Sequence, residues 1–152
     1  MQKFLRSPVR KEIGQPYIGV ASTDFAVADV LYVDTDGYLA LCPIGAPILG
    51  WCNEIKTTTS TNASTELYKP QYIPAEGVIM AIDADGDVTV AYLDGSQYKD
   101  FGTVTSGAFE IALGSISGGQ VKLLGYDPYN ESDDDLAICC AAEPQKLAFV
   151  TA

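Results

Sequence analysis

This chain has no histidine among its 152 residues. The side chains left to do chemistry are therefore mainly carboxylates, hydroxyls and thiols. General acid–base work and nucleophile activation most often use histidine, so Ser-His-Asp and Cys-His systems are excluded. Phosphate-binding glycine loops and the serine nucleophile elbow are absent from the sequence as well. We therefore predict a protein that is not an enzyme, with no catalytic residues and no cofactor.

Two carboxylate clusters come nearest to a site. Residues 34–37 (Asp-Thr-Asp-Gly) carry an extra aspartate relative to the Asp-Thr-Gly of aspartic proteases. Asp83, Asp85 and Asp87 alternate as in a calcium loop, but Val88 takes the place of the glycine that such a loop needs for its sharp turn. Both clusters fit hairpin turns better, and we predict no metal site within the chain. Carboxylates from separate chains could still converge on a cation.

The four cysteines, Cys42, Cys52, Cys139 and Cys140, form no Cys-x-x-Cys pair. Together with the lack of histidine, this excludes the usual zinc frameworks. Adjacent Cys139 and Cys140 would point to opposite faces of a strand, which indicates small, buried apolar side chains. A Cys42–Cys52 bridge across a hairpin stays open, although a reducing compartment disfavours it.

Charge is divided unevenly along the chain. Residues 13–152 carry 5 Lys and Arg against 19 Asp and Glu, whereas residues 1–12 carry 4 against 1. An acidic body repels phosphate, so we predict that the domain does not bind nucleic acid. The start lacks the apolar core of a secretory signal and no apolar run is long enough to span a bilayer, so we expect no membrane association and synthesis in the cytoplasm.

Apolar and β-branched runs separated by turn residues predict an all-β fold of about ten short strands with little helix. A small barrel, a tulip-like β domain and a sandwich all fit. Asp-Gly turns at 34–37 and 83–86, and the glycine-rich residues 114–119, predict hairpins. The run 29–34 is apolar on both faces, so another segment or a neighbouring subunit must cover its second face. The predicted strands are 17–21, 29–34, 38–41, 47–55, 77–83, 88–93, 108–113, 121–126, 136–141 and 146–151.

Three stretches stand apart from these strands. Residues 1–15 are predicted to form an extended arm, because two prolines bracket a polar segment, and residues 16–152 to form one β domain. Residues 56–75 are Thr-rich and long for a connection, which predicts a functional loop. The acidic residues 127–135 predict a solvated turn.

The arm and the loop tyrosines are the candidate contact sites. Exposed tyrosine offers a large contact area at a small entropy cost, and in the arm basic side chains lie on both sides of the apolar Phe4 and Leu5. The predicted partner-binding residues are Lys3, Phe4, Leu5, Arg6, Arg10, Lys11, Tyr68 and Tyr72.

Residues 28–39 (ADVLYVDTDGYL), followed by residues 45–50 (GAPILG), resemble the opening hairpin and third strand of tailed-bacteriophage head decoration, or cement, proteins. Residues 88–93 and 108–113 are similar to the middle strands of that family, and the pattern covers residues 17–55 and 77–126. The resemblance implies a small barrel or tulip-like domain on the capsid exterior. Such proteins are usually trimers or dimers that clamp neighbouring major capsid subunits against the pressure of the packaged DNA.

The arm fits that role. It could add a strand to the major capsid protein, or lie along it, with Phe4 and Leu5 as apolar anchors and the basic residues facing an acidic surface. We therefore expect a virion protein made in the host cytoplasm, with a trimer favoured over a dimer. The Thr-rich stretch and the four cysteines depart from the family and leave the oligomer geometry open.

Two other hypotheses stay open at this point. A carbohydrate-binding or adhesive β domain could use Trp51, Tyr68 and Tyr72 as an aromatic platform. A glycosidase would need two carboxyl groups facing each other across a cleft, about 5–10 Å apart.

Overall fold

The computed structural model describes residues 2–6, 17–61, 69–114, 119–126 and 135–143. Within these ranges the chain forms strands β1 to β12 and one short helix, α1 (Val90–Leu93). The predicted all-β fold with little helix is therefore confirmed. No helix in the described ranges is long and apolar enough to span a membrane.

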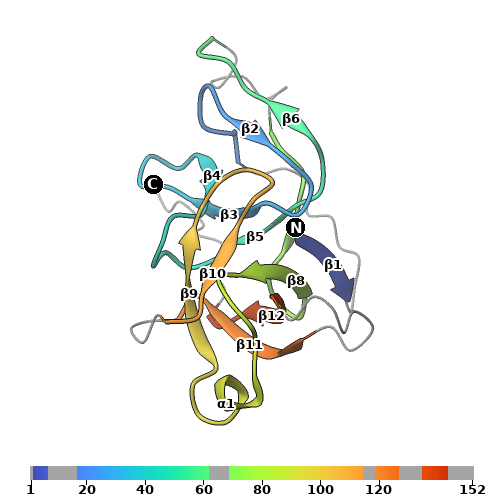
Figure 1. Cartoon of the computed structure of the whole chain (residues 1–152). Helices are drawn as coiled ribbons and strands as arrows, with labels where there is room; N and C mark the ends of the chain where they lie inside the picture. The colour runs from blue at the N-terminus through green and yellow to red at the C-terminus, as the bar shows by residue number, and fades with distance from the viewer. Residues whose placement is uncertain (1, 7–16, 62–68, 115–118, 127–134, 144–152) are drawn as a thin grey trace.

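Five strands close into a barrel, seen in the lower half of Figure 1. Every neighbouring pair in it is antiparallel except β8 and β10, which are parallel. Met80 and Ile82 of β8 are fully buried in the main core. The strand order around the barrel is β8 (Ile79–Ala84), β10 (Glu110–Ala112), β9 (Tyr98–Thr103), β11 (Val121–Tyr126) and β12 (Leu136–Ala141), and β12 pairs back to β8.

The N-terminal strand β1 (Gln2–Arg6) is added to this barrel from outside the ring. It runs antiparallel to β8 opposite Ile79–Ile82, while the short β10 pairs with Asp83 and Ala84. These residues are therefore part of the sheet, where the sequence predicted an arm apart from the body. The physical reason is the short length of β10, which leaves backbone groups of β8 that need a partner.

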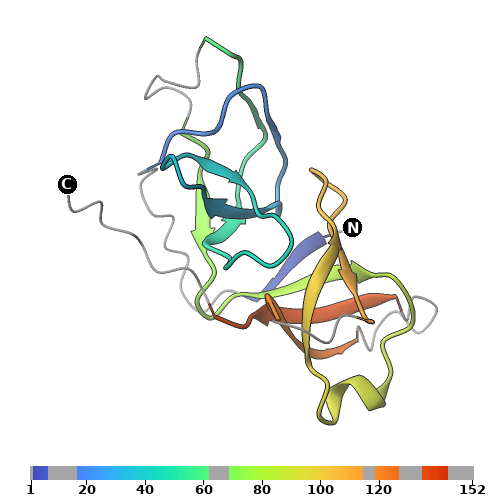
Figure 2. The same ribbon diagram turned by 90° about the vertical axis from the view of Figure 1, so that its left-hand side faces the viewer.

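A smaller lobe, residues 17–61 and 69–78, lies beside the barrel (Figure 2). Its four-stranded sheet has the order β4 (Leu39–Leu41), β3 (Val30–Val33), β5 (Gly50–Cys52) and β7 (Tyr72–Pro74). A second, two-stranded sheet joins β2 (Asp24–Phe25) to β6 (Lys56–Thr57).

The predicted hairpin at residues 34–37 is confirmed as the turn between β3 and β4. The amide of Asp34 donates to the carbonyl oxygen of Tyr38 at 2.8 Å. The Asp34 carboxylate in turn accepts from the amides of Asp36 and Tyr38. Gly37 has a φ of +85°, a left-handed conformation that glycine adopts without steric cost.

The four-stranded sheet is buried on both faces. Val30 joins the main core, which continues into the barrel, whereas Leu31 faces a second cluster with Phe25, Leu39 and Tyr72. The second face of β3 is thus covered by segments of the same chain, which resolves the two alternatives left by the sequence. Because the main core contains residues of both the small lobe and the barrel, the two pack as one body.

Two of the predicted hairpins are wrong. At residues 83–86, β8 continues through Ala84, and the carboxylate of Asp85 accepts from the amide of Leu113 instead of closing a turn. Residues 114–119 connect β10 to β11, but β9 lies between these strands in the sheet. In the first case the donor, the amide of Leu113, is distant in the sequence, and in the second β11 pairs with β9 instead of with the strand before it. Local turn chemistry can indicate neither.

Several predicted elements also differ in type. Residues 90–93 form α1 instead of a strand, and Val90 is 69% exposed there, with no sheet neighbour to bury it. Residues 17–21 make only a single bridge, Gly19 to Leu39. The stretch 56–75 begins with β6 and ends with β7, so it is not one long loop. Strand β9 was not predicted, and the strand expected at residues 146–151 lies outside the described residues.

Gly50 gives a test of the small lobe. A Cβ atom at this position would lie 2.3 Å from the Ile73 carbonyl oxygen, which is backbone of the paired strand β7 and cannot rotate away. We expect Gly50→Ala to lower the free energy of unfolding by an amount near the upper end of the usual cost of overpacking, about 1–3 kcal/mol. Gly114→Ala is the matched control, because its Cβ would meet nothing within 4 Å. Urea unfolding of both variants checks this, and equal midpoints would contradict the close approach of β5 and β7.

Candidate functional site

Four of the predicted partner-binding residues, Lys3, Phe4, Leu5 and Arg6, lie in β1. In its register with β8, Lys3 is opposite Ala81 and Phe4 is opposite Met80, and an irregularity follows before Arg6. The structure therefore brings these four together on one strand at the end of the sheet order. Arg10, Lys11 and Tyr68 lie outside the described residues.

Tyr72, predicted to be an exposed loop residue, is fully buried in β7, so that prediction is wrong. Its ring packs in the second core cluster between the two sheets of the small lobe. Burial, and to a smaller extent Tyr17, raises the pKa of its hydroxyl. Trp51 is fully buried as well. In this conformation neither ring is open to a partner, because the apolar face of their sheet requires them inside.

Sequence reasoning missed Asp29, a polar residue whose side chain is fully buried. Its Oδ1 accepts from the amide of Gly107 at 2.7 Å and from Gln2 Nε2 at 3.1 Å. Its Oδ2 accepts from Ser106 Oγ at 2.6 Å and from the amide of Ala26 at 2.8 Å. We call these five residues the Asp29 network. It satisfies the carboxylate at a place where water does not reach it.

Gln2 links this network to the barrel wall. Its Nε2 donates to Asp29, and its Oε1 accepts from the amide of Phe109 at 3.2 Å, just before β10 begins. Figure 2 shows β1 passing close to the β9–β10 hairpin, which carries Ser106 and Gly107. The start of β1 is thus held by side-chain bonds in addition to its pairing with β8.

Gln120 makes the corresponding link on the barrel side. It is 5% exposed, and its Nε2 donates to the carbonyl oxygens of Pro43 at 2.8 Å and Ala46 at 2.7 Å, both in the small lobe. Its Oε1 accepts from the amide of Phe101 at 3.2 Å. Both amide hydrogens of Gln120 are therefore used within the chain.

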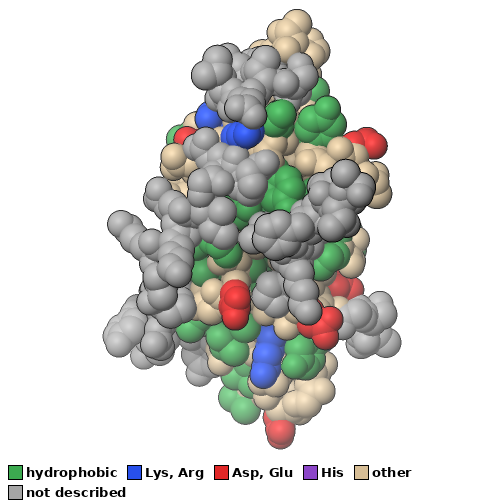
Figure 3. All heavy atoms as spheres, turned by 180° about the vertical axis from the view of Figure 1, so that it is seen from behind, with side chains coloured by type: hydrophobic (Ala, Val, Ile, Leu, Met, Phe, Trp, Pro, Cys, Tyr) green, Lys and Arg blue, Asp and Glu red, His purple; other side chains and the backbone are tan. Residues whose placement is uncertain are grey.

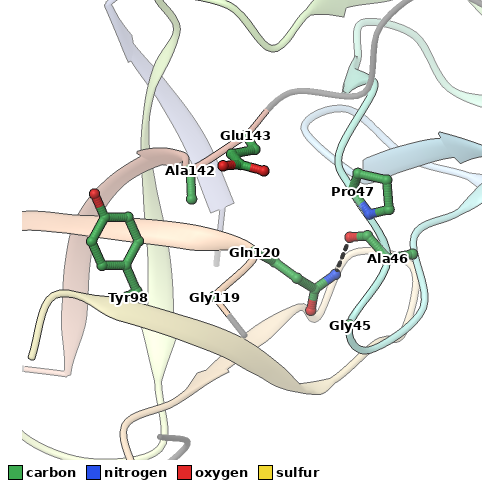
Figure 4. A pocket seen from close by; sticks show the side chains of 8 residues that line it. All are labelled: Gly45, Ala46, Pro47, Tyr98, Gly119, Gln120, Ala142 and Glu143. Carbon is green, nitrogen blue, oxygen red and sulfur yellow. Dashed lines mark hydrogen bonds between the residues drawn. The ribbon is translucent and has the colours of Figure 1, made fainter. Parts of the chain in front are cut away.

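A pocket of about 660 Å³ opens beside this link, between the loop of the small lobe and the barrel (Figure 4). Tyr98 at its rim is 53% exposed, and Lys122 Nζ lies 5.9 Å from the centre of the Tyr98 ring. The Gln120 side chain in this lining is engaged by the small lobe, whereas Glu143 contributes a carboxylate to the pocket. The full lining is Gly45, Ala46, Pro47, Tyr98, Gly119, Gln120, Ala142 and Glu143.

Within the described ranges, no group of three or more Cys, Asp and Glu side chains is arranged to hold a metal ion. All four cysteines are free thiols, so the Cys42–Cys52 bridge left open by the sequence does not form. Burial raises the pKa of Cys42 to about 12 and that of Cys52 to about 11, and it raises the pKa of Cys139 as well. These thiols are protonated and unreactive at neutral pH.

Comparison with known proteins found no matching family model, no matching curated protein and no matching solved structure.

The Asp29 network supplies a stability prediction. Asp29→Asn keeps the side-chain volume but turns one acceptor oxygen into a donor that faces two other donors, so buried hydrogen bonds are lost. We expect a loss of about 3 kcal/mol or more in the free energy of unfolding, since each unsatisfied buried donor costs about 1–3 kcal/mol. Asp24→Asn is the control, because exposed Asp24 accepts from Thr57 Oγ1 only at the surface. Similar urea midpoints for the two variants would argue against the network.

The buried thiols predict a loss of stability at high pH. In the unfolded chain they ionise near their ordinary pKa of 9.0, whereas in the folded chain Cys42 and Cys52 stay protonated to about pH 11–12. The folded state therefore binds more protons above pH 9, and its stability falls as pH rises, by up to about 1.4 kcal/mol per pH unit for each thiol. Urea unfolding between pH 8 and 11 measures this slope. The slope should become shallower in the Cys42→Ala/Cys52→Ala variant. An unchanged slope would show that these two thiols do not cause the loss of stability.

Proposed function

We propose that this chain is a structural protein that decorates a bacteriophage capsid and stabilises it by clamping neighbouring major capsid subunits. The class comes from the resemblance of residues 28–39 and 45–50 to head decoration proteins. The observation that carries the proposal is β1: the segment with the basic residues Lys3 and Arg6 is an edge strand. Among the described strands it pairs with β8 alone, so its second backbone edge faces no strand there.

An edge strand of this kind supports attachment by strand addition. An extended segment of a partner can align with β1, and the backbone hydrogen bonds then supply affinity. The basic side chains of the segment favour an acidic partner surface and speed the encounter. The rest of the chain is acidic, and Figure 3 shows acidic side chains spread over one face of both the small lobe and the barrel. Net charge of this kind keeps a protein made in many copies soluble before assembly.

The body behind β1 supports the same role, because a clamp must resist deformation. Asp29 and Gln120, both buried, connect the small lobe to the barrel through hydrogen bonds at two separate places. A carbohydrate-binding domain has less support, since Trp51 and Tyr72, two of its three proposed platform residues, are fully buried.

Charge reversal tests the attachment without removing β1 or Gln2. We expect Lys3→Glu/Arg6→Glu and Arg10→Glu/Lys11→Glu each to reduce co-sedimentation with heads built from the major capsid protein of the same genome, by at least tenfold in apparent affinity. The expected loss follows from like-charge repulsion at an acidic capsid surface. Binding by the unaltered chain should also weaken as salt is raised.

Lys69→Glu/Lys122→Glu is the control, because it changes the net charge equally but lies in the body. Retained binding in the control, with loss in the two N-terminal variants, supports the proposal. If all three variants lost binding equally, the loss would be explained by net charge alone, which would contradict the proposal. If none of them lost binding, the basic segment would have no part in attachment.

A further inference from the structure

We propose that β1 is exchanged between copies of this chain, so that the β8 edge of one copy is filled by the N-terminal strand of a second copy. The partner of this surface is thus a second copy of the same protein, which contributes residues Gln2–Arg6 to the sheet. The inference does not depend on a capsid partner. It concerns the backbone edge of β1 that pairs with β8, and it leaves the opposite edge of β1 open for the proposed attachment.

The first support is that the barrel is complete without β1. The ring β8–β10–β9–β11–β12 closes through the pairing of β12 with β8. On the other edge of β8, β10 occupies Asp83 and Ala84 and β1 occupies Ile79–Ile82. The site for β1 is therefore a preformed half-edge that any strand with the right register can fill, since backbone pairing does not depend on which copy supplies it.

The second support is that the site selects this particular strand. Gln2 bonds to Asp29 and to the amide of Phe109 at the same time, with one side chain that both donates and accepts. Asp29 is fully buried, so an empty half-edge would leave its carboxylate with one partner fewer. These bonds are identical whether Gln2 belongs to the same copy or to another, and they fix the register of the incoming strand.

The third support is connection and charge. Ten residues separate Arg6 from Tyr17, where the small lobe begins, and ten residues can span up to about 33–36 Å. That reach is comparable to the width of a small domain, so β1 can arrive at a neighbouring copy. Residues 1–12 are net basic and residues 13–152 are net acidic, so the strand of one copy is attracted to the body of another.

Disulfide trapping between separately marked chains tests the exchange. Lys3 and Ala81 are Cα partners, and opposite positions in an antiparallel pair lie about 4.5–5.5 Å apart, within the range of a disulfide. We would co-express a size-tagged Lys3→Cys chain with an untagged Ala81→Cys chain, both carrying Cys140→Ser to remove the half-buried thiol. Mild oxidation should give the linked pair of tagged and untagged chains as the main product on a non-reducing gel.

Lys3→Cys co-expressed with Val90→Cys is the control, because Val90 is exposed on α1 and away from this pairing. The proposal requires strong linkage in the first pair and only background linkage in the second. Equal linkage in both pairs overturns it. Absence of linkage in the first pair overturns it too, as does a mass by light scattering that stays at one chain of 16.2 kDa under the same conditions.

Discussion

The buried carboxylate of Asp29 is the constraint on which the arrangement of this molecule depends. A charged group without access to water is tolerated only if its oxygens are fully hydrogen-bonded. Its four donors come from β1, from the loop before β3 and from the β9–β10 hairpin. Three segments that are distant in the sequence must therefore reach the same point, and this requirement positions the N-terminal strand against the barrel.

Gln120 imposes a matching requirement from the other side. Where Asp29 extends from the small lobe to donors of the barrel, Gln120 extends from the barrel to carbonyl oxygens of the small lobe. Between them runs the main core, which contains Trp51 of the lobe and Phe101 of the barrel. Any rotation of one lobe against the other would break buried hydrogen bonds at two places and open the core. Such a rotation is therefore opposed at both places and by the shared core.

Local chemistry in the sequence was sufficient for part of this fold. The turn at residues 34–37 was predictable because Asp34 and Gly37 satisfy the hairpin by themselves. Strand β9 was missed because Lys99 and Asp100 interrupt its apolar pattern, and both are buried only through tertiary contacts such as that of Lys99 with Tyr92. The run at residues 88–93 has the composition of a strand, yet none of the described strands pairs with it, and residues 90–93 form α1.

The candidate site, like the fold, was predictable from the sequence only in part. The charge asymmetry identified the N-terminal segment, but Asp29 looked like an ordinary residue at the start of a strand. Its partners Ser106 and Gly107 are 77 and 78 positions away, so no spacing in the sequence could connect them. Tyr72 was misplaced for the related reason that the two prolines around it suggested a loop, whereas Cys52 of β5 pairs with it as a strand.

A small number of bonds attaches β1 to β8. Four Cα pairs and two side-chain bonds of Gln2 hold it, and a hydrogen bond contributes only about 1 kcal/mol net. Release of β1 therefore costs a few kcal/mol on that scale, while the closed ring of five strands keeps its own pairing. The proposed exchange of β1 would therefore leave the strand pairing of the barrel intact. The proposed role in assembly requires this combination of a closed barrel and a strand held at its edge.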